Sequence, residues 1–194
     1  EIVGDYLVEE IIGVGGMAVV ARAAHRAYRH EVAIKLLLPT AGRSTEVVKR
    51  FEREQRTLLQ LHSEHTVRIY AAGTHGKLPY MILELLEGID LAELIKSRGP
   101  LDVERAVSAM LQACHALAEA HSLGIVHRDL KPGNLFLTRR HDGSPCVKVL
   151  DFGISKVSQN APGGQEDTLT RTRVVMRTPF YMSPEQMLSS RDAD

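Results

Sequence analysis

Short apolar runs separated by turn signals occupy the first part of the chain. Runs rich in β-branched or apolar residues fall at 6–12, at about 18–25 and at 31–38. Glycine or polar residues separate these runs, and this arrangement predicts an antiparallel meander of strands. Two further runs, at 66–73 and 79–84, predict the strands that complete a small sheet.

Residues 44–61 have a helical period instead. The apolar side chains of one predicted helix face are Val47, Phe51, Leu58 and Leu61. Their spacing of three or four positions is that of a helix packed on a core. Ser44 is the predicted N-cap, and Glu54 falls on the same apolar face.

From Asp90 onward the pattern predicts helices. Asp90 and Glu93 have the spacing of a capping box, and Gly99 followed by Pro100 ends this first helix. A longer apolar-periodic helix follows through Val103, Ala106, Val107, Met110, Leu111, Leu117 and Ala118.

The remaining pattern sets the fold class. Short strands are predicted at 135–138 and 147–150, and residues 154–178 have the composition of a long mobile loop with few core residues. We therefore predict an α+β fold with two lobes. An antiparallel sheet plus one helix forms lobe 1–86, and a mainly helical, incomplete lobe covers 87–194.

The composition excludes several classes of function. The chain has 24 Lys plus Arg against 24 Asp plus Glu, so no net field favours nucleic acid or an anionic membrane. No apolar run approaches the ~20 residues of a membrane helix, and no signal-peptide pattern is present. The nine histidines show no HExxH-type spacing, so we expect no zinc site.

The two cysteines, Cys114 and Cys146, make no disulfide framework, which favours a reducing cytoplasm. Cys114 lies in an apolar helical stretch and is therefore predicted to be a packed core thiol.

A glycine-rich turn, Gly13-Val-Gly15-Gly16-Met-Ala18, lies between two predicted strands. Glycines let the backbone approach a phosphate closely and offer N–H groups to it. A dinucleotide-binding turn would be followed by a helix, whereas a strand follows here. Taken alone, the turn is also compatible with a plain glycine-rich hairpin.

Lys35 lies in the apolar strand segment Val-Ala-Ile-Lys at 32–35. A lysine there could extend to solvent along its aliphatic stem. Glu54 argues against this, because an unpaired carboxylate on an apolar helix face would cost several kcal/mol. We therefore predict an ion pair between Lys35 and Glu54.

Residues 127–134 read His-Arg-Asp-Leu-Lys-Pro-Gly-Asn, and Asp-Phe-Gly follows at 151–153. Together with the glycine turn, these motifs resemble those of protein kinases, in that family's order and over nearly the whole chain. The Gly-Gly-Met and Ser-Pro-Glu-Gln segments look most like the bacterial branch, the eukaryotic-like (Hanks-type) Ser/Thr kinases. The resemblance implies transfer of the γ-phosphoryl group of Mg·ATP to Ser or Thr hydroxyls of protein substrates.

The resemblance also implies roles for the residues of these motifs. Asp129 would accept the proton of the substrate hydroxyl, and Lys131 would neutralise charge on the transferring phosphoryl group. Asn134 and Asp151 would bind Mg²⁺ through oxygen atoms, the ligands which that ion prefers.

The residues implied for ATP binding are Gly13, Gly15, Gly16, Val20, Ala33, Lys35, Glu84, Leu86, Asp90 and Phe136. Lys35, held by Glu54, would orient the α- and β-phosphates. Backbone groups of segment 84–86 would bind adenine, and Leu83 would gate the rear of that pocket. Asp90 is explained equally well as a ribose ligand and as a helix N-cap.

Phosphorylation of the loop that follows Asp-Phe-Gly often switches kinases of this type. Thr170 and Thr172 are the predicted autophosphorylation sites, and Arg128 would pair with a phosphate there. Ala18 stands where the family has a third glycine, and because alanine limits φ, this departure bears on the flexibility of the glycine turn and its fit to phosphate. Arg177 also stands where the family usually has glycine, which bears on the local backbone or on regulation.

The motifs leave a second function open, a nucleotide-binding pseudokinase that acts as a scaffold or switch. Its usual signature, the loss of Lys35, Asp129 or Asp151, is absent from the sequence. The resemblance ends shortly after Ser-Pro-Glu at 183–185, so we expect a truncated catalytic domain of low stability and activity, with apolar surface exposed on the long helix. We further expect a cytoplasmic location, a parent protein that could carry a membrane anchor, and self-association for autophosphorylation between two copies.

Overall fold

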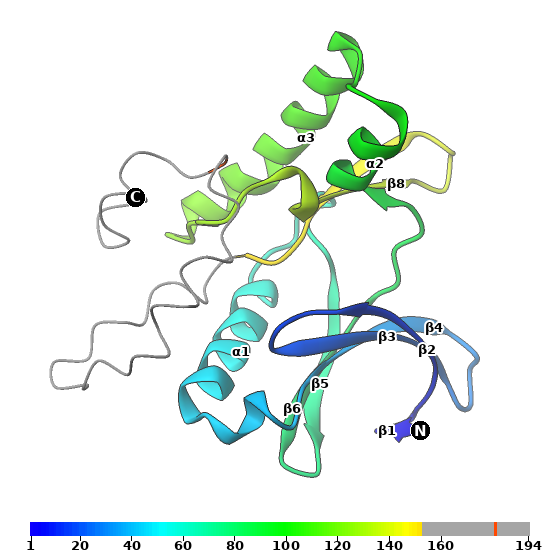
Figure 1. The fold of residues 1–194 in the computed structure, drawn as a ribbon, viewed down its shortest axis with the longest axis vertical. Helices are drawn as coiled ribbons and strands as arrows, with labels where there is room; N and C mark the ends of the chain where they lie inside the picture. The colour runs from blue at the N-terminus through cyan, green and yellow to red at the C-terminus, as the bar shows by residue number, and fades with distance from the viewer. Residues whose placement is uncertain (153–180, 182–194) are drawn as a thin grey trace, which may run out of the picture.

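A computed structural model describes residues 1–152 and Tyr181, which form two lobes joined near Glu84. In Figure 1 the strands β1–β6 and helix α1 lie in the lower lobe, and α2, α3 and β8 lie in the upper lobe. The residues that carry the long-loop prediction, and Arg177, lie outside the described residues.

The lower lobe is built on a six-stranded antiparallel sheet of order β1-β2-β3-β4-β6-β5. Its strands are β1 (Ile2–Val3), β2 (Tyr6–Val14), β3 (Ala18–His25), β4 (Glu31–Leu37), β5 (Ile69–His75) and β6 (Leu78–Glu84). The five strands predicted from the apolar runs are confirmed, and the short β1 is an addition.

Strand alternation gives this sheet two different faces. Ala33 and Lys35 share one face of β4, and the register places Val20 of β3 opposite Lys35. That face joins the main core, which contains Ala18, Ala33 and Leu37. The other face carries a smaller apolar cluster of Val3, Ala23, Val32, Ile34 and Ile82.

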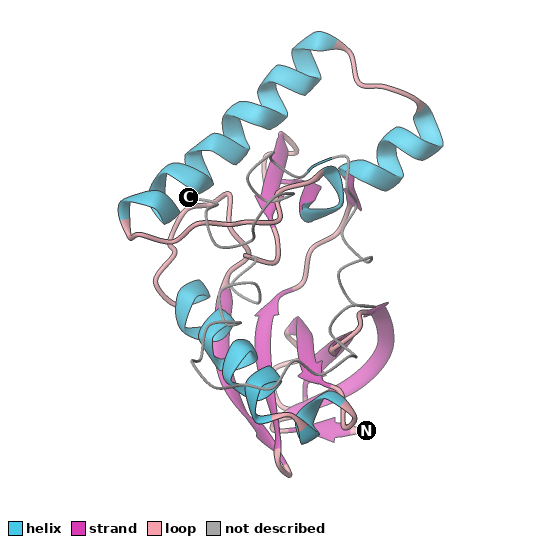
Figure 2. Cartoon of the chain, turned by 60° about the vertical axis from the view of Figure 1, so that its left-hand side comes forward, coloured by secondary structure: helices cyan, strands magenta, loops and turns pink. Residues whose placement is uncertain are grey.

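One helix covers the main-core face of the sheet. A 3₁₀ turn, η1 (Ala41–Arg43), leads into α1 (Thr45–Leu58), and the Ser44 hydroxyl accepts the Val47 N–H as predicted for an N-cap. Phe51 and Leu58 are buried in the core, as their spacing predicted. Figure 2 shows α1 beside the sheet and below the long helix.

The upper lobe contains the helices that were predicted beyond residue 90. Its elements are β7 (Ile89–Asp90), α2 (Leu91–Arg98), α3 (Val103–Ser122), η2 (Pro132–Asn134), β8 (Leu135–Arg139) and β9 (Pro145–Val149). Asp90 caps α2 by accepting the Glu93 N–H at 2.9 Å, and Gly99, with φ of 83°, ends it. A side chain at this φ would be strained.

One apolar core continues from the sheet into the upper lobe. It contains Phe51 and Leu58 of α1 together with Val147 and Val149 of β9. Phe152, which is 2% exposed, belongs to the same core. Apolar burial therefore fixes the chain on both sides of the predicted Mg²⁺ ligand Asp151.

Helix α3 buries a narrow stripe of small residues and exposes larger ones. The buried residues are Ala109, Ala113, Ala116 and Ala120. The exposed large residues are Val103, Val107, Met110 and Leu111. The expected apolar surface on the long helix is thus confirmed.

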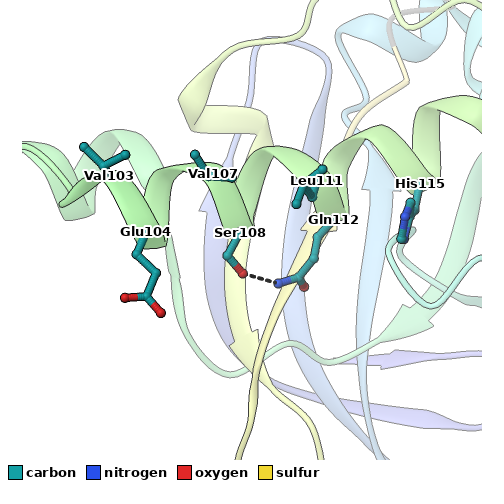
Figure 3. Close-up of a pocket in the computed structure, with 7 residues that line it drawn as sticks. All are labelled: Val103, Glu104, Val107, Ser108, Leu111, Gln112 and His115. Carbon is teal, nitrogen blue, oxygen red and sulfur yellow. Dashed lines mark hydrogen bonds between the residues drawn. The ribbon is translucent and has the colours of Figure 1, made fainter.

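A shallow groove follows this outward side of α3, as Figure 3 shows. It is lined by Val103, Glu104, Val107, Ser108, Leu111, Gln112 and His115. The groove contains none of the site residues that were predicted from the sequence.

The prediction for Cys114 is wrong. This thiol is exposed, because it lies beside the alanine stripe rather than within it. The buried cysteine is Cys146 of β9.

Within the described part of the chain, no helix is both long and apolar enough to cross a membrane.

We predict that a thiol reagent will modify the two cysteines of the native protein at very different rates. Cys146 is 3% exposed, and burial raises the pKa of its thiol, which lowers its reactivity. Titration with a chromogenic disulfide should therefore show one fast and one slow thiol. Cys114→Ser should remove the fast phase and Cys146→Ser should keep it. Equal rates for both thiols would contradict this assignment of burial.

Candidate active site

Lys35 joins three elements at the boundary between the lobes. Its ammonium Nζ lies 2.6 Å from Glu54 Oε1 of α1 and 2.7 Å from Asp151 Oδ1, two residues beyond β9. The predicted pair of Lys35 and Glu54 is confirmed. The additional bond to Asp151 was not predicted, and it brings a proposed phosphate ligand against a proposed Mg²⁺ ligand.

The electrostatics of this cluster follow from burial and from unequal numbers of charges. Burial opposes the charge of Lys35, but the two carboxylates outweigh it and raise the pKa of the lysine above its ordinary value. Burial raises the pKa of Glu54, Lys35 acts against this, and Asp151 adds to it by repulsion. Because two carboxylates share one ammonium, the site has excess negative charge that favours a further cation.

Asp151 is held in an unusual backbone conformation. Its φ is 49°, and Arg128 of the 127–134 segment has φ of 61°. Left-handed conformations at residues other than glycine cost of order 1 kcal/mol and persist when the surroundings fix them. Here the surroundings are the bond to Lys35 on one side and buried Phe152 on the other.

The second cluster comes from the segment 127–134. Lys131 Nζ lies 3.1 Å from Asp129 Oδ2. The amide Nδ2 of Asn134 donates to the Asp129 carbonyl at 2.8 Å. The structure therefore brings together the proposed base, the proposed phosphoryl-binding lysine and one proposed Mg²⁺ ligand.

His127 links the two clusters, a role that sequence analysis did not assign. Its Nε2 is 2.9 Å from the Leu150 carbonyl, and its Nδ1 accepts the Asp129 N–H at 3.2 Å. These partners fit a neutral ring that carries its proton on Nε2. The ring also lies 4.9 Å, centroid to centroid, from that of Phe152. The Leu150 N–H donates to the Asn134 carbonyl at 2.9 Å, which ties the same two segments again.

The glycine turn fits between β2 and β3 without strain at Ala18. The Gly15 N–H donates to the Ala18 carbonyl at 2.8 Å, and Ala18 sits in the regular register of β3 opposite Leu37. Ala18 is not among the described residues with positive φ, so the limit that its side chain places on φ causes no strain here. A Cβ added at Gly16 would meet no atom within 4 Å, so the space beside this residue of the turn is open.

The predicted walls of the adenine pocket come from both lobes. Ala33 of β4 pairs in register with Leu83 of β6, and both are buried. Half-buried Phe136 of β8 pairs with Asp90 of β7. The cap that Asp90 provides for α2 confirms its structural role, and its ribose role stays a prediction.

The connection between the lobes contains an ion pair that the sequence did not reveal. Glu84 Oε1 lies 2.6 Å from Lys148 Nζ of β9 and accepts the Arg68 N–H at 2.7 Å. The Glu84 N–H donates to the Arg68 carbonyl at 2.9 Å. The predicted adenine contacts of Glu84 and Leu86 would therefore use backbone groups other than this N–H. A lysine in an otherwise apolar strand was the signal that could have pointed to Lys148.

Other predicted residues are placed in part or not at all. Arg128 is half-buried beside Asp129, whereas Thr170 and Thr172 lie outside the described residues. Across residues 1–152 and Tyr181, no three His, Cys, Asp or Glu side chains cluster as they would around a metal ion.

We predict that Lys35→Met lowers the free energy of unfolding by about 3 kcal/mol near neutral pH, because it leaves Glu54 buried without its cation. The loss should shrink in mild acid. A carboxyl whose pKa is raised in the folded state binds a proton there before the unfolded chain does, so its burial costs less as the pH falls. Urea unfolding at both pH values measures this, with exposed Lys77→Met as the control. A loss that does not change with pH would contradict the assignment.

Residues 6–194 match the family model described as "Protein kinase domain". A serine/threonine-protein kinase of Corynebacterium efficiens, drp72, is 38% identical over 192 residues, which cover 96% of this chain and 35% of that protein. Pkn1 of Myxococcus xanthus is 38% identical over 185 residues, or 95% of this chain and 26% of that protein. PknB of Mycobacterium tuberculosis is 34% identical over 185 residues, or 93% and 28%.

The fold is also similar to a solved structure. The PknI kinase domain of Mycobacterium tuberculosis, crystallised as a double mutant, superposes with a TM-score of 0.65 at 26% identity. The match covers 78% of this chain and 59% of that one. The chain spans about a third or less of the length of the curated relatives named above. From the match over residues 6–194, the chain belongs to the protein kinase family, and its relatives are bacterial serine/threonine-protein kinases.

Proposed function

We propose that this chain is the catalytic part of a protein kinase that transfers the γ-phosphoryl group of ATP to Ser or Thr hydroxyls of proteins. The observation that carries the proposal is the pair of linked clusters at the lobe boundary. Lys35 with Glu54 and Asp151 forms one cluster, and Asp129 with its neighbours forms the other. His127 connects them through hydrogen bonds to both segments.

ATP would lie between the lobes. The glycine turn would offer its N–H groups to the phosphates, and open space around Gly16 fits this role. Lys35 would bind the α- and β-phosphates, oriented by Glu54. Adenine would lie between Val20 and Ala33 of the sheet and Phe136 below, because these side chains come from the two lobes that face each other.

The residues present fit Mg²⁺. Asp151 and Asn134 offer oxygen atoms, and the Asn134 amide is oriented by its Nδ2 bond to the Asp129 carbonyl. The excess negative charge around Lys35 favours a cation at the same place. When bound, Mg²⁺ would neutralise charge on the phosphate oxygens.

Asp129 would orient the attacking hydroxyl and accept its proton. Its N–H is held by His127 and its carboxylate by Lys131, so the group is positioned before a substrate binds. Lys131 would stabilise the charge that develops on the transferring phosphoryl group. The lysine at this position supports Ser and Thr over Tyr as the acceptors.

The regulation, partners and location remain part of the proposal. Thr170 and Thr172 would be phosphorylated by a second copy of the protein, and Arg128 would pair with the resulting phosphate. Balanced charge argues against nucleic acid as a partner. A cytoplasmic location fits the reduced state of the two cysteines.

We predict that Asp129→Asn lowers the transfer of labelled phosphate by at least about 100-fold, the lower bound expected for a general base. The assay uses Mg·ATP with the chain itself and a generic protein as acceptors. Asp142→Asn, in an exposed turn, removes the same charge and should leave the rate unchanged. Equal rates for Asp129→Asn and wild type would refute the proposed base.

We also predict that stabilisation by ATP requires both Mg²⁺ and Asp151. A ligand at about 100 times its dissociation constant stabilises the folded state by about 2.7 kcal/mol. The thermal shift of wild type should therefore collapse when EDTA is added, and Mg²⁺ should have no effect on Asp151→Asn. A shift that survives both changes, together with no phosphate transfer, would favour the nucleotide-binding pseudokinase.

A further inference from the structure

The stretch 62–66, which we call the brace, connects α1 of the lower lobe to β5 but binds the upper lobe. The N–H groups of His62 and Ser63 donate to Glu119 Oε1 and Oε2, each at 2.8 Å. Glu119 lies in the last turn of α3. A single carboxylate of the upper lobe thus holds the first two amides of the brace.

The rest of the brace pairs with β9. The Val149 N–H donates to the His65 carbonyl at 2.7 Å, and Thr66 forms a parallel bridge with Val149. His65 Nδ1 also lies 3.0 Å from the Val147 carbonyl. The brace therefore lies along β9 through an isolated β-bridge and two further hydrogen-bond contacts.

A second side chain of α3 holds β9 itself. Gln112, which Figure 3 places on the groove side of α3, accepts the Val147 N–H through Oε1 at 2.9 Å. Helix α3 therefore binds β9 through Gln112 and the brace through Glu119. The three segments form one hydrogen-bonded unit.

This unit leads directly to both carboxylates that bind Lys35. Glu54 lies one turn before the end of α1, and the chain reaches the brace a few residues later. Asp151 follows β9 by two residues. A shift of the brace would therefore displace Glu54 and Asp151 relative to Lys35, which belongs to the sheet of the lower lobe.

The two hydrogen bonds that Glu119 accepts are strong enough to hold the brace in place. Hydrogen bonds to an ionised acceptor are roughly twice as strong as neutral ones. The Glu119 side chain is 26% exposed, so solvent competes for it only in part. The brace follows the C-terminal end of α1, so these two bonds fix where that end lies.

We propose that Glu119 is a positioning residue that sets the Lys35–Glu54–Asp151 cluster through the brace. Glu119 contacts backbone amides of the brace rather than the cluster itself. Its effect on phosphate transfer rests on the proposed kinase function, whereas its effect on α1 does not.

Amide hydrogen exchange tests the positional claim without requiring activity. In Glu119→Gln, one carboxylate oxygen becomes a donor that opposes an N–H of the brace. Exchange in α1 and the brace should accelerate by about tenfold, the factor that one lost charged hydrogen bond predicts. Strands β3 and β4 should exchange at the wild-type rate. Unchanged exchange in α1 would overturn the proposal, and Glu119→Asp replaces the variant if Glu119→Gln does not fold.

Kinetics then separate positioning from general stability. Well below the unfolding temperature, Glu119→Gln should lower kcat/KM for Mg·ATP about tenfold, whereas Glu104→Gln, an exposed change on the same helix, should not. In a Glu54→Gln background, Glu119→Gln should lower kcat/KM by less than about twofold, because both residues act through one ion pair. If the double variant instead shows the product of the two single losses in kcat/KM, the proposal is overturned. If the wild type transfers no phosphate, the exchange result alone decides the role of Glu119.

Discussion

The Lys35 ammonium is the point at which three parts of the chain meet, because it binds two carboxylates from different segments. Strand β4 supplies the lysine, α1 supplies Glu54, and the segment just after β9 supplies Asp151. Helix α1 follows β4 along the chain, whereas Asp151 lies 116 positions from Lys35, and each element is fixed by its own apolar packing. A buried carboxylate without a cation is costly. The arrangement of the lobes that brings all three groups together is therefore favoured.

Each of the two clusters also contains a residue in a strained backbone conformation that neighbouring contacts hold in place. Arg128 and Asp151 both have positive φ, and His127 bonds to the residue adjacent to each. One buried imidazole therefore holds the two segments in register. This explains why an apolar neighbour such as Phe152 matters to the chemistry: it packs against the ring and keeps it in place.

Much of this arrangement could be predicted, because its causes are local. The strands follow from apolar runs, α1 from its period and its Ser44 cap, and the Lys35–Glu54 pair from a carboxylate on an apolar face. The bonds of Glu119 could not be predicted, since they join residues 56 and 57 positions apart. The error at Cys114 has a related cause. Helix α3 is apolar on several sides, so the pattern alone does not indicate which side the core will cover.

The alanine stripe of α3 gives a physical reason for the contacts that sequence could not show. Small residues such as Ala113 and Ala116 let the helix backbone approach β9 closely. At that distance a glutamine is long enough to reach the strand's N–H, and a glutamate to reach the brace beyond it. Larger residues in the stripe would move α3 outward and break both contacts. The packing of the upper lobe and the position of the brace therefore depend on the same close approach.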